Sequence, residues 1–156
     1  MNSADLLEKA ITIAVEAHRG QRDRTGAPYI VHPTRVMAGV DSDIEKIVAI
    51  LHDVVEDTDW TFERLTQEGF PAEVIEALKC VTKREGEEYD DFVKRSASNK
   101  IARKVKLADL EHNMDARRLS NVTEKDVERL KKYVRAWRFL KGLDQKEKSR
   151  NHLSAL

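Results

Sequence analysis

The stretch LHDVVEDTDW, which begins at residue 51, places four side chains that can bind a metal ion or move a proton within six positions. They are His52, Asp53, Glu56 and Asp57, and they form two pairs whose members are four residues apart. Residues four apart share one face of a helix, and like charges on one face repel unless a cation or a proton relieves them. Only Lys46 lies near this cluster as a neutralising base. The stretch is therefore either a solvated acidic face or the floor of a metal site.

Two residues far from this stretch in the sequence offer matching ligands. Asp109 falls on the flank of the apolar stripe of its helix, where a carboxylate is costly without a partner. His32 precedes Pro33, so its imidazole stands at the mouth of a helix. With His52 and Asp53 they would make a mixed nitrogen and oxygen site suited to Mn²⁺, Fe²⁺ or Zn²⁺. The alternatives are an Asp109 that forms a salt bridge or a cap, and a His32 held by a backbone carbonyl.

The spacing also supplies a candidate base for phosphate chemistry. A divalent ion screens the charge of a phosphate group and acidifies water, and a nearby carboxylate can then order or deprotonate that water. Glu56 lies one turn beyond His52 on the same helix face, where such a base should be. Two close carboxylates titrate as a pair, so either Glu56 or Asp57 could hold the proton.

Basic side chains cluster in the loop that leads to His32. Arg19, Arg22 and Arg24 lie in this loop, and guanidinium groups bind phosphate through two parallel hydrogen bonds. We therefore expect this loop to contact an anionic substrate. Two further pairs of bases are alternatives: Lys83 with Arg84, and Lys104 with Lys106.

The elements that must position these residues are helices. Apolar residues recur at helical spacing along most of the chain, and no alternating segment of strand length competes with them. The spacing predicts helices from Leu6 to near Gly20, from Pro33 onward, over 43–57, 62–68, 72–82 and 89–97, and from Lys100 to about Arg118. A last helix is predicted to begin at Thr123, where Thr123 and Asp126 can form a capping box. We predict an all-α fold, an irregular bundle of about seven or eight helices. Residues 1–143 would form one domain and residues 144–156 a polar C-terminal tail.

The composition excludes several classes of function. Lys plus Arg is 28 and Asp plus Glu is 28, so no net charge attracts the chain to nucleic acid or to a membrane. The first helix has charged residues among its apolar ones, unlike a signal peptide, and no run approaches the roughly 18 apolar residues of a membrane span. Cys80 is the single cysteine, which fits a reducing compartment. We expect a cytoplasmic protein that binds a small molecule. The sequence does not indicate its oligomeric state.

Four motifs together resemble a known family. YIVHP, LHDVVEDT, VTKREGE and KLADLEHNM, in this order and spacing, resemble the HD-domain metal-dependent phosphohydrolases. The strongest resemblance is to the hydrolase domain of RelA/SpoT-type alarmone enzymes and to their single-domain relatives, the small alarmone hydrolases of the Mesh1 type. It runs from about Ala10 to Asp115 and implies the irregular helical bundle of the HD-domain type.

The resemblance also implies roles for individual residues. It assigns the metal, usually Mn²⁺ in this family, to one set of ligands: His32, His52, Asp53 and Asp109. Glu56 and Asp57 resemble the pair that orients or deprotonates the attacking water. Arg24 and Asn113 match positions that line the nucleotide and phosphate pocket. The implied reaction removes the 3′-pyrophosphate of guanosine tetra- or pentaphosphate and leaves GDP or GTP.

One residue departs from the family pattern. Well-studied members have two consecutive basic residues before the glycine of this loop, whereas QRDRTG has Asp23 at the first position and Arg24 at the second. An acid beside a polyphosphate would repel it. Either Asp23 turns away, or Arg22 takes over the contact, or the substrate carries less phosphate.

Two other functions therefore compete with alarmone hydrolysis. The same site could hydrolyse another nucleotide or a dinucleotide cofactor phosphate, and Asp23 is the feature that favours this reading. A non-catalytic module could instead sense a nucleotide through a dead site, although all six metal and catalytic positions are retained. A nucleic-acid binder is disfavoured because no aromatic residue alternates with the loop arginines.

Overall fold

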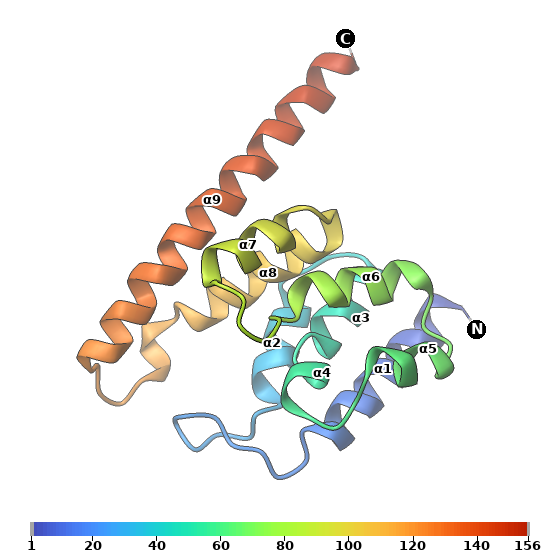
Figure 1. The fold of residues 1–156 in the computed structure, drawn as a ribbon, viewed down its shortest axis with the longest axis horizontal. Helices are drawn as coiled ribbons and strands as arrows, with labels where there is room; N and C mark the ends of the chain where they lie inside the picture. The colour runs from blue at the N-terminus through green and yellow to red at the C-terminus, as the bar shows by residue number, and fades with distance from the viewer. Residues whose placement is uncertain (1, 156) are drawn as a thin grey trace.

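The helices surround one central helix, α3 (Figure 1). A computed structural model describes residues 2–155, and within them the chain forms nine α-helices and one 3₁₀ helix, η1. Their bounds are α1 Ser3–Ala17, α2 Val31–Ala38, α3 Asp43–Leu51, α4 Val54–Asp57, α5 Phe62–Gln67, α6 Ala72–Val81, α7 Tyr89–Ala97, α8 Lys100–Asn113, η1 Ala116–Arg118 and α9 Glu124–Ser154. The β pairing in this range is one isolated bridge between Arg22 and Pro28. The all-α prediction is confirmed.

Helix α3 is central because it is apolar on nearly all sides. It packs against α1, α2, α6 and α8, and Ile47, Val48, Ile50 and Leu51 are almost completely buried. A helix that is hydrophobic all round is stable only inside a protein. The main core therefore forms around α3, and the end of this helix is fixed at the centre of the molecule.

The helices begin at recognisable caps. Ser42 and Glu45 form a capping box at the start of α3, and Thr123 and Asp126 form the predicted one at the start of α9. Each box satisfies two backbone N–H groups that have no partner within the helix. Glu45 is buried and also binds Lys104 of α8 at 2.5 Å, so the cap ties α3 to α8.

The prediction of one helix over residues 43–57 is wrong. Helix α3 ends at Leu51, His52 and Asp53 form a turn, and a single further turn of helix makes α4. The ring of His52 bonds to the carbonyl of Ala49 at 2.7 Å, and Asp53 has flattened backbone angles (φ −100°, ψ −4°). The break allows the adjacent side chains of His52 and Asp53 to face the same point, which a continuous helix would not.

Two other boundaries differ from the prediction. Helix α2 begins at Val31, so His32 lies in its first turn and is not held in an extended conformation by Pro33. Pro33 fits there because the first four N–H groups of a helix need no intrahelical partner. Helix α8 ends at Asn113 instead of continuing to Arg118, and the chain then bends through η1.

Helix α9 is longer than the sequence pattern indicates. Ala136 and Leu140 are buried against Val93 of α7 and Leu110 of α8, which forms a second, smaller core. The helix continues through residues 144–154, predicted as a polar tail, and its last turns extend away from the other helices (Figure 1). Arg103 of α8 pairs with Asp144 and Glu147, so the first part of this segment is attached to the bundle. None of the helices within residues 2–155 is long and apolar enough to cross a bilayer.

Candidate active site

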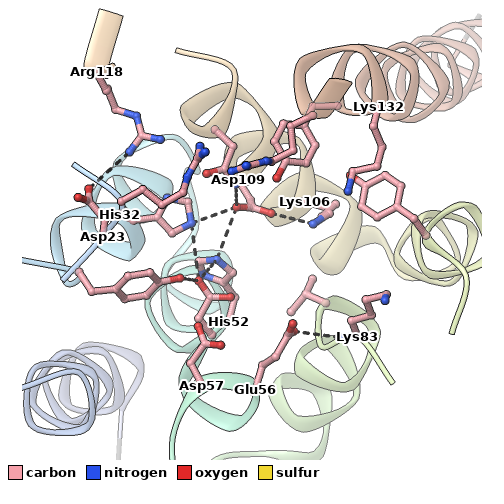
Figure 2. A pocket seen from close by; sticks show the side chains of 18 of the residues that line it. Asp23, His32, His52, Glu56, Asp57, Lys83, Lys106, Asp109, Arg118 and Lys132 are labelled. Atoms are coloured by element: carbon pink, nitrogen blue, oxygen red, sulfur yellow. Dashed lines mark hydrogen bonds and ion pairs between the residues drawn. The ribbon is translucent and has the colours of Figure 1, made fainter. Parts of the chain in front are cut away.

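The four residues predicted as metal ligands converge at one point (Figure 2). His32 Nε2 lies 3.1 Å from Asp109 Oδ1, and His52 Nε2 lies 2.9 Å from Asp53 Oδ2. The two crossed distances, His32 to Asp53 and His52 to Asp109, are both 3.7 Å. Ligand atoms of His32, His52 and Asp109 lie within 4.8 Å of one another. Helix α2, the break after α3 and helix α8 each contribute to this group.

The two histidines are oriented as metal ligands usually are. The carbonyl of Ala49 can only accept a hydrogen bond, so His52 Nδ1 donates to it, and in the neutral ring the lone pair is therefore on Nε2. That Nε2 is buried and faces Asp53 Oδ2 at 2.9 Å, although no contact of it within residues 2–155 has hydrogen-bond geometry. His32 Nδ1 lies 2.7 Å from His112 Nδ1, so the second ring nitrogen of His32 is also engaged. A metal-binding histidine almost always has its other nitrogen held in this way.

Asp53 is held by a partner from the loop before α2, and Asp109 by two partners on its own helix, α8. Tyr29 Oη donates to Asp53 Oδ2 at 2.6 Å. Lys106 Nζ donates to Asp109 Oδ2 and Asn113 Nδ2 donates to Asp109 Oδ1, both at 2.8 Å. Sequence reasoning missed Tyr29, although it lies three residues before His32 within a motif that had been singled out. Its hydroxyl and the side chain of Asn113 fix the carboxylate oxygens that face the histidines.

The charges of the cluster depend strongly on one another. Burial lowers the pKa of His52, but Asp53 and Asp109 together raise it well above its usual value. Burial would raise the pKa of Asp109, but Lys106 and the two histidines hold it well below its usual range. The pKa of Asp53 falls to about 2 despite its burial because His52 lies beside it. Buried carboxylates and imidazole lone pairs that face one another need a cation, so this donor set fits a divalent metal ion.

Glu56 and Asp57 lie on α4, next to the cluster and open to the cleft above it (Figure 2). Glu56 Oε2 accepts a hydrogen bond from the backbone N–H of Lys83 at 3.1 Å. Partial burial raises the pKa of Glu56, and the charges of Asp53 and Asp57 act in the same direction. The pKa of Asp57 is raised by burial and by Asp53. The pKa values of both carboxylates are thus closer to the pH range in which a carboxylate can accept and release a proton.

The cluster forms the floor of a cleft of about 520 Å³ whose upper walls are basic. The basic residues that line it are Arg22, Arg24, Lys83, Lys106, Arg118, Arg129 and Lys132. Asn113 lines it as well, so all three residues predicted to bind substrate reach the cleft. Arg19 and Lys104 do not line it: Arg19 pairs with Glu16 and Lys104 with Glu45.

Sequence reasoning missed the part of the basic wall that α9 provides. Arg129, Lys132 and Tyr133 line the cleft, and their spacing of three and four residues places them on one helix face. That spacing was a readable signal, but nothing local indicated that this face meets the cleft. Burial lowers the pKa of Lys132, and the neighbouring bases Arg129 and Lys106 lower it further.

Asp23 lines the cleft but is engaged by its own loop. Its Oδ1 accepts hydrogen bonds from Thr25 N at 2.8 Å, Thr25 Oγ1 at 2.7 Å and Ala27 N at 3.0 Å. Its Oδ2 lies 4.0 Å from Arg118 Nη1. The neighbouring Arg24 is paired with Asp126 of α9 at 2.6 Å.

Comparisons with known proteins agree with this architecture. A scan against protein-family models finds no match. The guanosine-3′,5′-bis(diphosphate) 3′-pyrophosphohydrolase of Aquifex aeolicus is 40% identical over 84 residues, which are 51% of this chain and 12% of that protein. The bifunctional (p)ppGpp synthase/hydrolase SpoT of Escherichia coli is 35% identical over 125 residues, which are 69% of this chain and 17% of that protein. The chain thus spans less than a fifth of either relative.

A solved structure extends the likeness to nearly the whole chain. It is a metazoan ortholog of SpoT, described as hydrolysing ppGpp and playing a role in starvation responses. The TM-score is 0.68 at 26% sequence identity, and the match covers 93% of this chain and 95% of the other. The fold is therefore the all-α bundle of HD-type hydrolases. Together, the relatives and the solved structure support a small domain of the RelA/SpoT hydrolase type.

Proposed function

We propose that the chain is a metal-dependent pyrophosphohydrolase that removes the 3′-pyrophosphate from guanosine 3′,5′-bis(diphosphate) and from the corresponding pentaphosphate. The observation that carries this proposal is the convergence of two histidines and two carboxylates beneath a basic cleft. The names of the relatives support the same reaction. The products would be pyrophosphate and GDP or GTP.

In this proposal the metal is held by the nitrogen and oxygen atoms that converge at the floor of the cleft: His32, His52, Asp53 and Asp109. Mn²⁺ suits such a mixed donor set, and it is the ion that we propose. When bound, a divalent ion there supplies the positive charge that screens the phosphate and acidifies a water molecule. The hydrogen bond that the carbonyl of Ala49 accepts, and those that Tyr29, Lys106 and Asn113 donate, support the proposal because they fix the inward-facing ligand atoms.

Glu56 and Asp57 would accept the proton of the attacking water. Their raised pKa values bring them closer to neutral pH, where a general base works best. The backbone N–H of Lys83 holds one oxygen of Glu56, so the other oxygen remains free to orient water. We assign the base to this pair and not to one member, because close carboxylates share their protons.

The bases of the cleft would hold the phosphate groups of the substrate. Arg22, Arg24 and Asn113 line one side, and Lys132 of α9 lines another. A volume of about 520 Å³ lies within the roughly 300–1,000 Å³ of small-molecule sites. We propose that the chain binds a nucleotide and that it binds neither nucleic acid nor a membrane surface. We also propose that it acts in the cytoplasm.

The competing substrate, another nucleotide or a dinucleotide cofactor phosphate, rested on Asp23 as a repulsive acid. One of its oxygens is occupied by three hydrogen bonds from the loop, which reduces the weight of that argument. A non-catalytic sensor would not need Glu56 and Asp57 beside the metal ligands. Alarmone hydrolysis is therefore the reading that the site supports best.

A product analysis with purified protein loaded with Mn²⁺ tests the proposal. Guanosine tetraphosphate, NADPH and GTP are supplied separately, and pyrophosphate and orthophosphate are measured. We expect pyrophosphate and GDP from guanosine tetraphosphate, and loss of turnover after chelation. Release of orthophosphate alone, from any of the three, would contradict the proposal. Tight binding of guanosine tetraphosphate without any product would favour the sensor.

A further inference from the structure

Two ion pairs connect the loop before α2 to the segment between α8 and α9. Asp23 faces Arg118 of η1 at 4.0 Å, and its neighbour Arg24 binds Asp126 at the start of α9 at 2.6 Å. The two loop residues have opposite charges, and so do their partners. In the first pair the base, Arg118, lies outside the loop, whereas in the second pair the base, Arg24, belongs to the loop.

Asp23 divides its two oxygens between two tasks. Oδ1 accepts three hydrogen bonds from Thr25 and Ala27 and so closes the loop on itself. Oδ2 takes no part in these bonds and is the oxygen nearest to Arg118 (Figure 2). The charge of Asp23 is therefore directed toward a base and is partly neutralised before any substrate arrives.

Arg118 has the features of an anion-binding side chain. It lines the cleft, and its side chain is 25% exposed. Its Nε is buried and has no hydrogen-bond partner within the described residues. Asp23 is its one carboxylate neighbour within 4.0 Å in residues 2–155.

We propose that Arg118 binds a phosphate group of the substrate and that Asp23 positions Arg118 for this contact. The acid in the loop would then increase the affinity for a polyphosphate instead of reducing it. The loop lacks one of the two bases that its resemblance to the family leads one to expect, and Arg118 of η1 supplies a base next to Asp23. This inference rests on the proposed function, because it concerns the same site and substrate.

The two readings of Asp23 predict changes of opposite sign. If Asp23 repels the substrate, removing its charge lowers KM. If Asp23 positions Arg118, removing the charge of Asp23 raises KM, and this effect occurs only when Arg118 is present. Asp23→Asn separates them cleanly, because the amide oxygen can still accept the loop hydrogen bonds from Thr25 and Ala27.

The test is a double-mutant cycle of Asp23→Asn and Arg118→Gln on the Mn²⁺-loaded protein with guanosine tetraphosphate. We expect Arg118→Gln to raise KM about tenfold, which corresponds to the loss of one charge-assisted hydrogen bond, and to leave kcat within about twofold of the native value. Asp23→Asn should raise KM by about threefold in the native chain and leave it unchanged in the Arg118→Gln chain. A lower KM for Asp23→Asn, or equal effects in both backgrounds, would overturn the proposal. So would an unchanged KM for Arg118→Gln.

A matched control lies on the same 3₁₀ helix. Asp115 pairs with the highly exposed Arg117 and lies outside the cleft, so Asp115→Asn removes an Asp–Arg pair without touching the site. It should leave KM unchanged. Circular dichroism and melting temperature of each variant establish that the fold is retained.

Binding of inorganic pyrophosphate to the Mn²⁺-loaded protein separates this inference from the proposed function. If the native chain does not hydrolyse guanosine tetraphosphate, the proposed function fails, yet the same cycle can be measured on the pyrophosphate Kd. We expect Arg118→Gln and Asp23→Asn each to weaken pyrophosphate binding, with no further loss in the double variant. Tighter binding by Asp23→Asn would refute the pairing whatever the substrate is.

Discussion

The floor and the rim of the cleft are built in different ways. We call the floor the four residues His32, His52, Asp53 and Asp109. We call the rim the loop 20–29, the connector 114–123 and the first turns of α9, residues 124–133. At the floor each side chain is largely buried and each has a second partner that fixes its orientation. At the rim the contacts are ion pairs whose bases, Arg24 and Arg118, are more exposed than the side chains of the floor. Buried, fully partnered groups hold reactive geometry, whereas exposed charges adjust affinity.

This comparison suggests a division of labour. The floor would decide which reaction occurs, because metal chemistry tolerates little displacement of its ligands. The rim would decide which phosphate compound is held, because its charges act over several ångströms and can be replaced one at a time. A floor residue whose substitution changed only KM, or a rim residue whose substitution changed only kcat, would contradict this division.

The largest effect is expected at the floor. His52→Ala removes a metal-ligand atom, so the variant should lose its bound metal. Its rate of hydrolysis should fall by at least about 10³-fold, since the metal supplies the charge on which the reaction depends. Metal content by mass spectrometry and pyrophosphate release measure the two losses. A variant that kept stoichiometric Mn²⁺ would contradict the ligand assignment, and circular dichroism controls for unfolding around the buried ring.

Removing the proposed base should separate metal binding from turnover. Glu56→Ala is expected to keep its Mn²⁺ and to lose about 10²- to 10⁴-fold in kcat, the usual contribution of a general base. Calorimetric titration with Mn²⁺ and single-turnover kinetics make the comparison. Hydrolysis at the native rate would remove Glu56 from the mechanism, and the same measurement on Asp57→Ala shows how the pair divides its role.

Tyr29→Phe tests the outer support of the floor. The variant keeps the ring but loses the hydroxyl that donates to Asp53 at 2.6 Å. We expect Mn²⁺ affinity to fall roughly 10- to 100-fold, the usual effect of losing such a partner, with kcat largely restored at saturating metal. Tyr133→Phe, in the wall of the cleft, is the matched control and should keep native metal affinity. Unchanged metal affinity in Tyr29→Phe would mean that Asp53 is held by the histidines alone.

At the rim the expected changes are smaller and fall on KM. Lys132→Gln removes one charge from the wall of the cleft and should raise KM by about three- to tenfold with little change in kcat, because a charge distant from the reacting atoms mainly attracts the substrate. The difference from the native chain should shrink as salt is added. A change in kcat alone would place Lys132 in the chemistry and would weaken the contrast between floor and rim.

The smallest effect is expected from Arg19. This residue pairs with Glu16 at the exposed end of α1, outside the cleft. Arg19→Gln should leave KM unchanged and should alter the free energy of unfolding by less than about 1 kcal/mol. Kinetics and urea unfolding measure both quantities, and a raised KM would mean that the cleft is wider in solution than the structure indicates.

The sequence predicted the floor better than the rim. His32, His52, Asp53 and Asp109 lie in motifs whose residue types already indicate metal chemistry, and the structure brings them together. Their role as ligands stays a prediction. The break after Leu51 was missed because it depends on the ring of His52 and its bond to Ala49, which helical periodicity does not report.

The loop arginines of the rim were predicted, but the pairing within the rim could not be, because it is made by long-range contacts. Arg118 reaches Asp23 only because α8 ends at Asn113 and the chain bends through η1. The continuation of α9 past residue 143 was missed for a similar reason. Its polar composition looks like a tail, whereas the pairing of Glu147 with Arg103, 44 residues earlier, attaches it to the bundle.

The most direct test of the account follows the oxygen atom of water. Guanosine tetraphosphate is hydrolysed by the Mn²⁺-loaded protein in ¹⁸O-labelled water, and both products are analysed by mass spectrometry. If the floor activates water for attack on the 3′-phosphorus, one labelled oxygen appears in pyrophosphate and none in GDP. Label in GDP, or orthophosphate in place of pyrophosphate, would contradict the account.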